Sequence, residues 1–535
     1  MNKKTLFLIP AMIGTTLGSL CFTGCAKNRT KADVYENGKL VLDLRNLYFD
    51  GYSGGDDYLA DLEDRFDIKC KFQAYSWAKW SEQVTSALDG DNAEDVFHAN
   101  VDSYNFASTY KYWAEEKLTK QLPDDLSKWP NIKKLIDNTT NIDSLKLDGH
   151  LYGIPIAKNA DDPSTSFSPF TYVYRRDWAK QWDVYQENDE YTWAQFEALL
   201  EKFRKETDGS SKFALGDVEW GYPSITNFYK QVPHCFAQDE ITGKYVNNYT
   251  TDAYIKGLEQ SKRFEVNNWY GYGQYTATDG ELNKQYYQNN CGVLYENLSY
   301  SNYYTLRHNL EQTNALDKAF SVDDATAIMK IKGEDGKYVL EGTDNWFSMT
   351  FFDYRISDTK MYKVLDLLDY LLSEEGTRFS IFGTEGYDYT INESTGEVEI
   401  VEKNWPKDKD GTYAEKVNGG RYLRYLVCLG YETFDYDPIT NKEALDILNK
   451  WDGEMKTALG NGTLKVLKEN AEVMWLTSPL KAEYSGLLRT DALKAVTKYI
   501  ENDIKTIDEF KTTVETSKNN TWKKVLDEIN TVLKK

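Results

Sequence analysis

Strand and helix patterns alternate in the first part of the chain, and this alternation constrains the fold more than any other feature. Short apolar runs bounded by turn residues predict strands, and apolar residues three or four positions apart predict helices. These patterns predict strands at Lys39–Leu44, Ile68–Ala74 and Asp95–Ala99, and helices at Asp56–Phe66 and Trp77–Leu88. A βαβαβ order favours a parallel sheet with helices on both faces. Because ligands of such sheets bind beyond the carboxyl ends of the strands, we expect Phe49–Tyr52 and Asn100–Tyr104 to face a ligand.

The segment Asp148–Ile156 (DGHLYGIPI) separates this unit from a second one. Asp148-Gly149 is a turn dipeptide, and a short apolar run with strand character follows it. Pro155 holds its own φ at about −65° and favours an extended conformation for Ile154, so the chain leaves the turn as a straight connector. An extended connector between two α/β units can absorb a change in φ and ψ. We therefore predict a hinge at Gly153, Ile154, Pro155 and Ile156.

The rest of the chain contains a second set of strand and helix patterns. The sequence Thr192-Trp193-Ala194-Gln195 is a capping box that begins a helix extending to about Lys205, and a second capping box is predicted at Thr506–Glu509. The patterns also predict strands at Thr171–Tyr174, Cys291–Tyr295 and Asn345–Phe352, helices at Asp252–Val266 and Met361–Leu372, a polar-aromatic loop at Glu296–Tyr300 and a hairpin within Glu393–Glu402. The last hundred residues are expected to be mostly helical.

Composition and charge exclude several classes of function. The 535 residues are 41% hydrophobic and 14% aromatic, so the chain can form a large core. Its formal net charge is −22. Nucleic-acid binding requires neutralisation of phosphates, and peripheral binding to anionic lipid requires basic patches, so neither partner is expected.

The N-terminus predicts export and a lipid anchor. Lys3 and Lys4 precede the apolar stretch Thr5–Leu20, which is too short and too interrupted by glycine to span a membrane comfortably. The sequence Phe22-Thr23-Gly24-Cys25 resembles a bacterial lipobox, in which the cysteine is modified by lipid and becomes the N-terminus. We therefore expect a signal peptide at residues 1–24, lipidation of Cys25 and a polar tether at 25–38. The alternative is an ordinary secretory signal. The predicted location is the outer face of the bacterial cytoplasmic membrane, of the Gram-positive type.

Neither the cysteines nor the histidines have the spacing of metal ligands. Beyond Cys25 the chain has Cys70, Cys235, Cys291 and Cys428, without a CxxC pair. Export would permit disulfides in three connectivities, but buried free thiols are the preferred interpretation. The acidic turn Asp89–Asp95 lacks the glycine and the closing glutamate of a calcium loop. No metal and no cofactor are predicted.

Several segments resemble extracellular solute-binding proteins of ABC importers. They are LYGIPIA, FTYVYRRDW, YTWAQFEALLEKF, LLDYLLSEEGTRFSIFGTEGYDY, TIDEFKTTVE followed by WKKVLDEIN, and LDGDNAEDVF. The chain looks most similar to the large lipoprotein branch of family 1, distant relatives of maltose-binding proteins. The stretch DGSSKFALGD (208–217) departs from the longer calcium-like loop of many relatives, which agrees with the absence of a predicted metal.

The resemblance implies a two-lobed periplasmic-binding-protein-like α/β fold, in which each lobe has a central sheet flanked by helices. Lobe 1 would comprise 39–153 and about 340–430, and lobe 2 would comprise 154–330 and about 431–535. A ligand in the interlobe cleft would favour closure about the hinge. The resemblance further implies a monomer without catalytic residues, which delivers its ligand to ABC permease subunits.

The abundance of aromatic residues favours a carbohydrate ligand, and we expect an oligosaccharide, because sugar sites combine flat aromatic platforms with a few carboxylates and amides. Residues that can contact such a ligand are expected in loops beyond strands or ahead of late helices, where the competing interpretation is packing in the core or capping of a loop. The candidates are Asp102, Tyr104, Trp220, Tyr222, Asn297, Tyr300, Trp346 and Trp475. The sugar, its linkage and its length stay open.

Two other classes of function stay open. A secreted glycoside hydrolase would also be acidic and rich in aromatic residues, and it would need two carboxylates about 5–10 Å apart. A surface sugar sensor or adhesin could use the same fold without transport. The order of the family-like segments along the whole chain favours solute binding over both.

Overall fold

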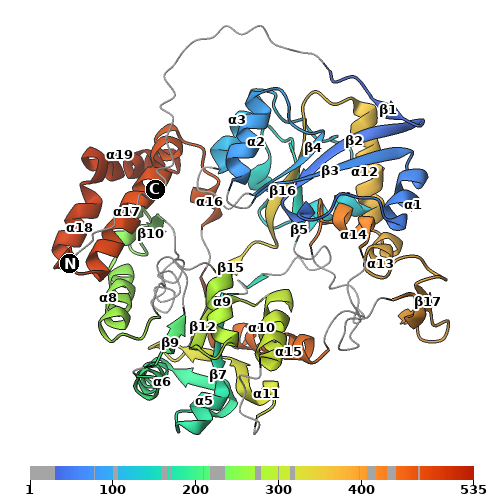
Figure 1. Ribbon diagram of the computed structural model, residues 1–535. Helices are drawn as coiled ribbons and strands as arrows, with labels where there is room; N and C mark the ends of the chain where they lie inside the picture. The colour runs from blue at the N-terminus through green and yellow to red at the C-terminus, as the bar shows by residue number, and fades with distance from the viewer. Residues whose placement is uncertain are drawn as a thin grey trace, which may run out of the picture.

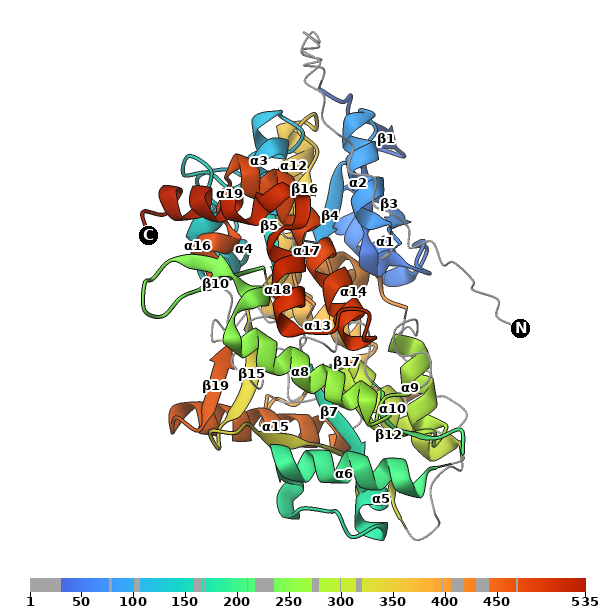
Figure 2. The same ribbon diagram turned by 90° about the vertical axis from the view of Figure 1, so that its left-hand side faces the viewer.

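The computed structural model forms two α/β lobes and a helical C-terminal unit (Figures 1 and 2). The structure describes residues 30–76, 79–100, 106–157, 166–167, 170–208, 210–216, 235–271, 279–298, 300–313, 320–396, 398–405, 417–429, 442–467 and 470–535. Within these ranges no helix combines the length and the apolar character that a membrane crossing requires.

Lobe 1 is built on a six-stranded mixed sheet. Its strands are β1 (Tyr35–Glu36), β2 (Lys39–Asn46), β3 (Ile68–Ala74), β4 (Val96–Asn100), β5 (Ile154–Ala157) and β16 (Trp346–Phe352). Strand β2 pairs in parallel with both β3 and β4, which confirms the parallel arrangement predicted from the βαβαβ pattern. Strand β16 returns from much later in the chain and pairs antiparallel with β4 and β5.

Helices lie on both faces of this sheet (Figure 1). They are α1 (Asp57–Arg65), α2 (Trp80–Asp89), α3 (Phe106–Glu115), α4 (Pro130–Asp137), α12 (Asp358–Leu372), α13 (Glu374–Phe382) and α14 (Gly419–Arg424), with the 3₁₀ turns η1 (Leu47–Phe49), η2 (Ile142–Leu145) and η5 (Glu402–Asn404). The predicted hairpin is present as β17 (Tyr389–Ile391) and β18 (Val398–Ile400).

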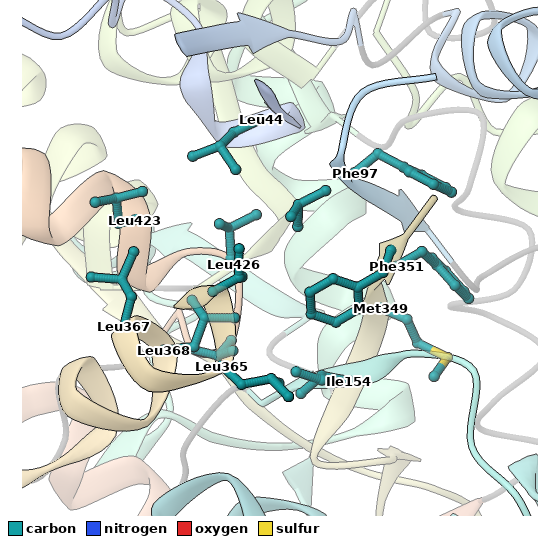
Figure 3. Packing of buried hydrophobic residues seen from close by; sticks show 14 of the residues in the cluster. Leu44, Phe97, Ile154, Met349, Phe351, Leu365, Leu367, Leu368, Leu423 and Leu426 are labelled. Atoms are coloured by element: carbon teal, nitrogen blue, oxygen red, sulfur yellow. The ribbon is translucent and has the colours of Figure 1, made fainter. Parts of the chain in front are cut away.

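The two faces of β4 and β16 contact different parts of the chain. Phe97 and Phe351 are cross-strand partners that stack on each other, and Trp113 of α3 packs edge-on against both rings. On the opposite face, Thr350 donates a hydrogen bond to the carbonyl of Leu426, just after α14. Figure 3 shows side chains from these strands, from α12 and from the α14 region in one continuous core.

Lobe 2 contains two smaller sheets. The first has the order β13 (Thr326–Ile328), β7 (Phe170–Arg175), β12 (Cys291–Asn297), β9 (Phe213–Gly216). The second has the order β19 (Leu464–Leu467), β15 (Tyr338–Thr343), β14 (Lys330–Lys332), β8 (Glu190–Thr192), and β6 (Ser166–Phe167) also pairs with β15. The helices of this lobe are α5 (Arg176–Gln181), α6 (Trp193–Glu206), α9 (Asp279–Tyr287), α10 (Tyr300–Gln312), α11 (Val322–Ala325) and α15 (Lys442–Gly460), with η3 (Glu187–Asp189).

Local sequence signals explain much of lobe 2. The capping box predicted at Thr192 is present, because its side chain accepts from the Gln195 N–H and the Gln195 side chain accepts from the Thr192 N–H. The apolar stripe of α6, including Trp193 and Phe196, is buried as its spacing predicts. The predicted loop Glu296–Tyr300 is partly wrong: β12 continues to Asn297, and Tyr300 begins α10.

The C-terminal helices form a unit with its own core rather than an extension of the lobe 2 core. The unit contains β10 (Phe236–Gln238), β11 (Tyr245–Asn247), η4 (Asn248–Thr250), α8 (Asp252–Val266), α16 (Ala471–Met474), α17 (Pro479–Ile500), α18 (Ile507–Glu515) and α19 (Ser517–Val532). At the start of α18, Thr506 caps the Glu509 N–H, but the Glu509 carboxylate accepts from Lys505 N–H. The predicted capping box is therefore only half formed.

The four cysteines beyond Cys25, which are Cys70, Cys235, Cys291 and Cys428, are all buried free thiols. This outcome confirms the preferred interpretation over any of the three disulfide connectivities.

A buried charge network lies at the end of lobe 1 where β4 begins and β16 ends. Lys360 of α12 is 3% exposed and donates to Asp95 Oδ2 at 2.7 Å, and Asp95 is 1% exposed. The Asp43 N–H also donates to Asp95 Oδ2. Lys31 pairs with Asp353 at 2.9 Å and approaches Asp95 at 3.5 Å.

This network corrects the prediction of a free tether that extends to residue 38. Lys31 is bound to lobe 1, and β1 pairs with the start of β2. The described part of the predicted tether, from residue 30 onward, is therefore part of the folded lobe.

We predict that Lys360→Met lowers the free energy of unfolding of lobe 1 by about 3 kcal/mol, because a buried carboxylate that loses its closest cation keeps its desolvation cost. Urea unfolding followed by fluorescence should show an earlier first transition. Lys363→Met on the same helix is the matched control, since Lys363 is only half-buried and its partner Asp67 is 78% exposed, so no buried charge loses its partner there. Equal shifts in the two variants would contradict the role given to the buried pair.

Candidate functional site

Three segments connect lobe 1 to the rest of the chain, and they leave it side by side. Ala157 at the end of β5 is a register partner of Trp346 at the start of β16. On its other side, Ala157 forms a parallel bridge with Cys428, in which Ala157 N–H donates to Val427 and Leu429 N–H donates to Ala157. All three crossings therefore occur at one corner of the sheet, as a hinge requires.

The second crossing in chain order, at residues 343–346, forms hydrogen bonds with lobe 1 immediately after the chain leaves lobe 2. Thr343 is still paired with Ser166 in the lobe 2 sheet. The next residue, Asp344, accepts hydrogen bonds from Thr140 and Asn141 of lobe 1. Asn345 accepts from Thr140 N–H and donates to the carbonyl of Asn138. The change from one lobe to the other thus falls at the Thr343–Asp344 peptide.

The predicted hinge Gly153–Ile156 lies next to this corner. Ile154, Pro155 and Ile156 are in β5, with Ile154 and Ile156 fully buried, and Gly153 packs against Phe351. These residues belong to the lobe 1 sheet and lead directly to the first crossing. Rotation about them stays a prediction.

Strand directions bring the carboxyl edge of lobe 1 towards the matching edge of lobe 2. The chain leaves lobe 1 at the carboxyl end of β5 and enters β7 at Phe170. Phe170 is the register partner of Asn297, the last residue of β12, and β9 runs parallel to β12. The carboxyl ends of β9 and β12 therefore lie at the edge of lobe 2 where the crossing enters, which is the position of a ligand in an α/β sheet.

A row of aromatic rings follows the carboxyl edge of lobe 1. The Tyr52 ring stacks on Tyr422 at 3.9 Å between centroids, Tyr422 meets Tyr425 at 5.9 Å, and Tyr425 meets Tyr48 at 5.6 Å. Tyr48 in turn stacks on His98 at 5.9 Å. Tyr48, Tyr422 and Tyr425 are half-buried, so part of each ring is accessible. We call these five residues the aromatic row.

His98 supports this row from within the sheet. Its Nδ1 lies 2.9 Å from Asn46 Oδ1, so the tautomer with a proton on Nδ1 donates to that oxygen. Asn46 also accepts from Tyr48 N–H and donates to the carbonyl of Tyr425, which connects the two halves of the row. Burial lowers the pKa of the His98 imidazole to about 3, so the ring is neutral at neutral pH.

Lobe 2 contributes an acid and an aromatic residue at the facing edge. Glu296 near the end of β12 is buried, and the Asn302 amide donates to its carboxylate at 3.2 Å. Tyr300 begins α10, is half-buried and stacks on Tyr304 at 6.0 Å. A fixed carboxylate and partly exposed rings are groups that can hold a polyhydroxylated ring.

The candidates predicted from the sequence differ in burial, and several of them lie outside the described residues. Trp346 is 3% exposed, its indole N–H donates to the carbonyl of Thr140, and its ring stacks on Trp475 at 5.6 Å. Trp346 therefore lies in the core at the crossing, which was the competing interpretation. Trp475 stays half-buried. Asn297 ends β12, but its side chain, like Cys25, Asp102, Tyr104, Trp220 and Tyr222, lies outside the described residues.

Tyr48, Tyr425 and Glu296 are not among the candidates predicted from the sequence. Tyr48 lies in η1, the turn after β2, so the rule that placed Phe49–Tyr52 near a ligand could also have included it. Tyr425 carries no such signal, because only tertiary packing brings its segment next to β2.

Comparison with solved structures identifies the same fold in solute-binding proteins. An extracellular solute-binding protein from Bifidobacterium longum subsp. infantis matches with a TM-score of 0.63 and 14% identity over 93% of this chain and 100% of that one. An alginate-binding protein matches with a TM-score of 0.62 and 14% identity over 92% and 98%. An N-glycan transport solute-binding protein from Streptococcus pneumoniae matches with a TM-score of 0.57 and 13% identity over 92% and 99%.

No protein-family model and no curated protein matches the chain. The structural matches nevertheless confirm the predicted fold class, a two-lobed α/β solute-binding-protein fold.

We predict that protonation of His98 destabilises the protein in acid. The imidazole is neutral in the folded state and has a pKa of about 6.5 when unfolded, so stability is lost as the pH falls from about 6.5 towards 3. Between pH 7.5 and pH 5, the parent should lose about 2 kcal/mol more than His98→Gln, which keeps a donor for Asn46. Chemical denaturation at several pH values measures this difference. Parallel curves for His98→Gln and the parent would refute the prediction.

Proposed function

We propose that the protein captures an oligosaccharide between its lobes and delivers it to an ABC importer. The observation that carries this proposal is the aromatic row at the carboxyl edge of lobe 1, opposite Glu296 and Tyr300 of lobe 2. Sugar rings present apolar C–H faces and a rim of hydroxyls, so they bind to flat aromatic surfaces flanked by carboxylates and amides.

The structural neighbours support the same class of ligand. They include an alginate-binding protein and an N-glycan transport solute-binding protein. Because these neighbours are binding proteins, we infer capture rather than catalysis, and the glycoside hydrolase becomes the weaker alternative. A sensor or adhesin without a permease is the other alternative, and co-purification with permease subunits would argue against it.

Closure would bring the two edges together around the ligand. A ligand that contacts both lobes favours the closed state by its additional interactions there. Because the Asp344–Trp346 segment is anchored in lobe 1, closure would bend the chain between Thr343 and Asp344 and in the two neighbouring crossings. Gly153–Ile156 would then stay fixed in lobe 1 and anchor the chain just before the first crossing.

The platforms proposed for the ligand are Tyr48, Tyr300 and Trp475, with Asp102 and Glu296 as partners of the hydroxyls. Tyr104, Trp220, Tyr222 and Asn297 complete the proposed site. The protein would act as a monomer, exported and attached to the membrane through lipid on Cys25 only.

We predict that replacing a central platform weakens oligosaccharide binding. Tyr48→Ala, Tyr300→Ala and Trp475→Ala should each cost about 2 kcal/mol, or roughly thirtyfold in affinity, because water does not replace the packing of a ring on a sugar face. Asp102→Ala should cost about 1–3 kcal/mol by leaving a ligand hydroxyl underpaired. A glycan array should first identify the ligand, and calorimetric titration then gives the affinities.

Tyr387→Ala is the matched control for these titrations, since its side chain is 62% exposed in the turn before β17. Each variant should keep the circular dichroism of the parent. If all four site variants bind as tightly as Tyr387→Ala, the proposed site is wrong. Release of reducing ends from the bound oligosaccharide would instead favour the hydrolase.

We predict that Cys25 carries the lipid anchor. Cys25→Ala should release the protein into the medium or block its processing, because the thiol that accepts the lipid is absent. Fractionation and intact mass spectrometry of the parent and the variant test this, with the buried Cys70→Ala as a control that should stay attached. Unchanged attachment and an unchanged lipid mass in Cys25→Ala would disprove lipidation at this residue.

A further inference from the structure

A separate pocket of about 530 Å³ lies in lobe 2 between α5, the end of α6 and the turn before β12. Its lining includes the cations Arg175 and Lys212 and the indoles of Trp178 and Trp182. Two carboxylates also line it, and each has a cationic partner: Asp177 pairs with Arg175, and Glu206 pairs with Lys202. This volume is within the range of small-molecule sites and much larger than an inorganic ion requires.

The pocket lies at the opposite edge of the lobe 2 sheet from the interlobe edge. Arg175 ends β7, whereas Phe170 begins it next to Asn297. A strand of this length extends roughly 17 Å. Lys212 precedes the start of β9, and Asn289 precedes the start of β12, so the amino ends of these strands face the pocket. Figure 2 shows α5 and α6 at the end of lobe 2 furthest from lobe 1.

Arg175 forms a fixed wall whose charge is already compensated. It is 1% exposed, and its guanidinium donates from Nε to Asp177 at 2.8 Å. It also donates to the second oxygen of Asp177 and to the side chain of Asn289. A bidentate pair of this kind is rigid and leaves little capacity for another anion.

Lys212 is the cation that lacks such compensation. Within the described residues no carboxylate pairs with its ammonium, which lies 5.2 Å from the centre of the Trp178 ring. Burial, followed by the positive charge of Arg175, lowers the pKa of Lys212 from its ordinary value, and Asp177 offsets only part of this effect. An ammonium has three donors, so Lys212 has hydrogen-bonding capacity for an anion that enters the pocket.

The aromatic wall of the pocket is held in place by the core. Trp178 and Trp182 lie 5.1 Å apart, and both pack edge-on against Phe203 of α6, at 5.5 and 5.3 Å. Trp178 is buried, while Trp182 is half-buried. Trp178, with Arg175 and Lys212 over its ring, thus holds Trp182 in place, and Trp182 provides a partly accessible apolar surface beside one uncompensated positive charge.

We propose that this pocket binds a monosaccharide-sized molecule with one carboxylate, of the hexuronic acid type, with the carboxylate on Lys212 and the sugar ring against the half-buried Trp182. One uncompensated cation matches one negative charge, whereas a phosphate dianion would need a second. The apolar wall matches the C–H face of a pyranose. This site is independent of the proposed interlobe site and does not rest on it.

Calorimetric titration of the mature protein with glucuronate tests the proposal, with glucose and inorganic sulfate as comparison probes. We expect saturable binding of glucuronate, at least tenfold weaker binding of glucose, and at least a tenfold loss of glucuronate affinity in Lys212→Met. Lys205→Met, an exposed lysine near the end of α6, is the matched control and should bind as the parent does. Tyr48→Ala should also bind glucuronate normally, which separates this site from the interlobe site.

Fluorine NMR of the protein labelled with 5-fluorotryptophan provides a readout that needs no lysine variant. Glucuronate should shift the Trp178 and Trp182 signals, assigned with Trp182→Phe, and glucose at the same concentration should not. No binding, equal binding of glucose, binding of sulfate alone, or unchanged affinity in folded Lys212→Met would overturn the proposal.

Discussion

The insertion of β16 between β4 and β5 is the pairing on which the rest of the structure depends. The register joins residues near position 350 to strands near positions 100 and 155, so the lobe 1 sheet is complete only after most of lobe 2 has been synthesised. The same insertion brings Trp346 beside Ala157 and places Thr350 against the carbonyl of Leu426. Strand β16 thus contacts both the first crossing, at Ala157, and the segment after α14 that contributes Tyr425 to the aromatic row. Pairing of such high sequence separation is slow to form, so lobe 1 is expected to complete its folding late.

Local sequence patterns predicted the helices and strands well wherever local interactions, such as capping and apolar spacing, determine them. The strand Ile68–Ala74 and the helix Asp252–Val266 have the predicted bounds, and Thr192 caps α6 as its sequence indicates. The antiparallel return of β16 and the separate core of the C-terminal helices carry no local signal. The same limit applies to the proposed site: Tyr300 was predicted from its position after a strand, whereas tertiary contacts, such as the hydrogen bond from Asn46 to its carbonyl and its ring contact with Tyr48, bring Tyr425 beside β2.

The aromatic residues divide into two groups that composition alone could not separate. Trp193, Phe196 and Phe264 are mutually packed in the lobe 2 core and account for part of the aromatic excess. The rings of Tyr48 and Tyr425 instead sit on a polar support, since Asn46 and His98 lie beneath them. The hydrogen bonds of Asn46 reach the backbone of Tyr48 and Tyr425, so they fix these two segments while the half-buried rings stay partly accessible, as the site that we propose requires.

The contact of Lys31 with Asp353 would limit how far the folded protein can stand from the lipid that we propose on Cys25. With Cys25 as the attached residue that we propose, six residues of chain reach at most about 20 Å, and Lys31 is fixed at the end of lobe 1 opposite the aromatic row. The amino edge of the sheet would thus face the bilayer at close range, and the edge with the aromatic row would face outward. Such a short connection would keep the folded protein close to the membrane surface. It would then meet a transporter in the same membrane mainly by lateral diffusion in two dimensions.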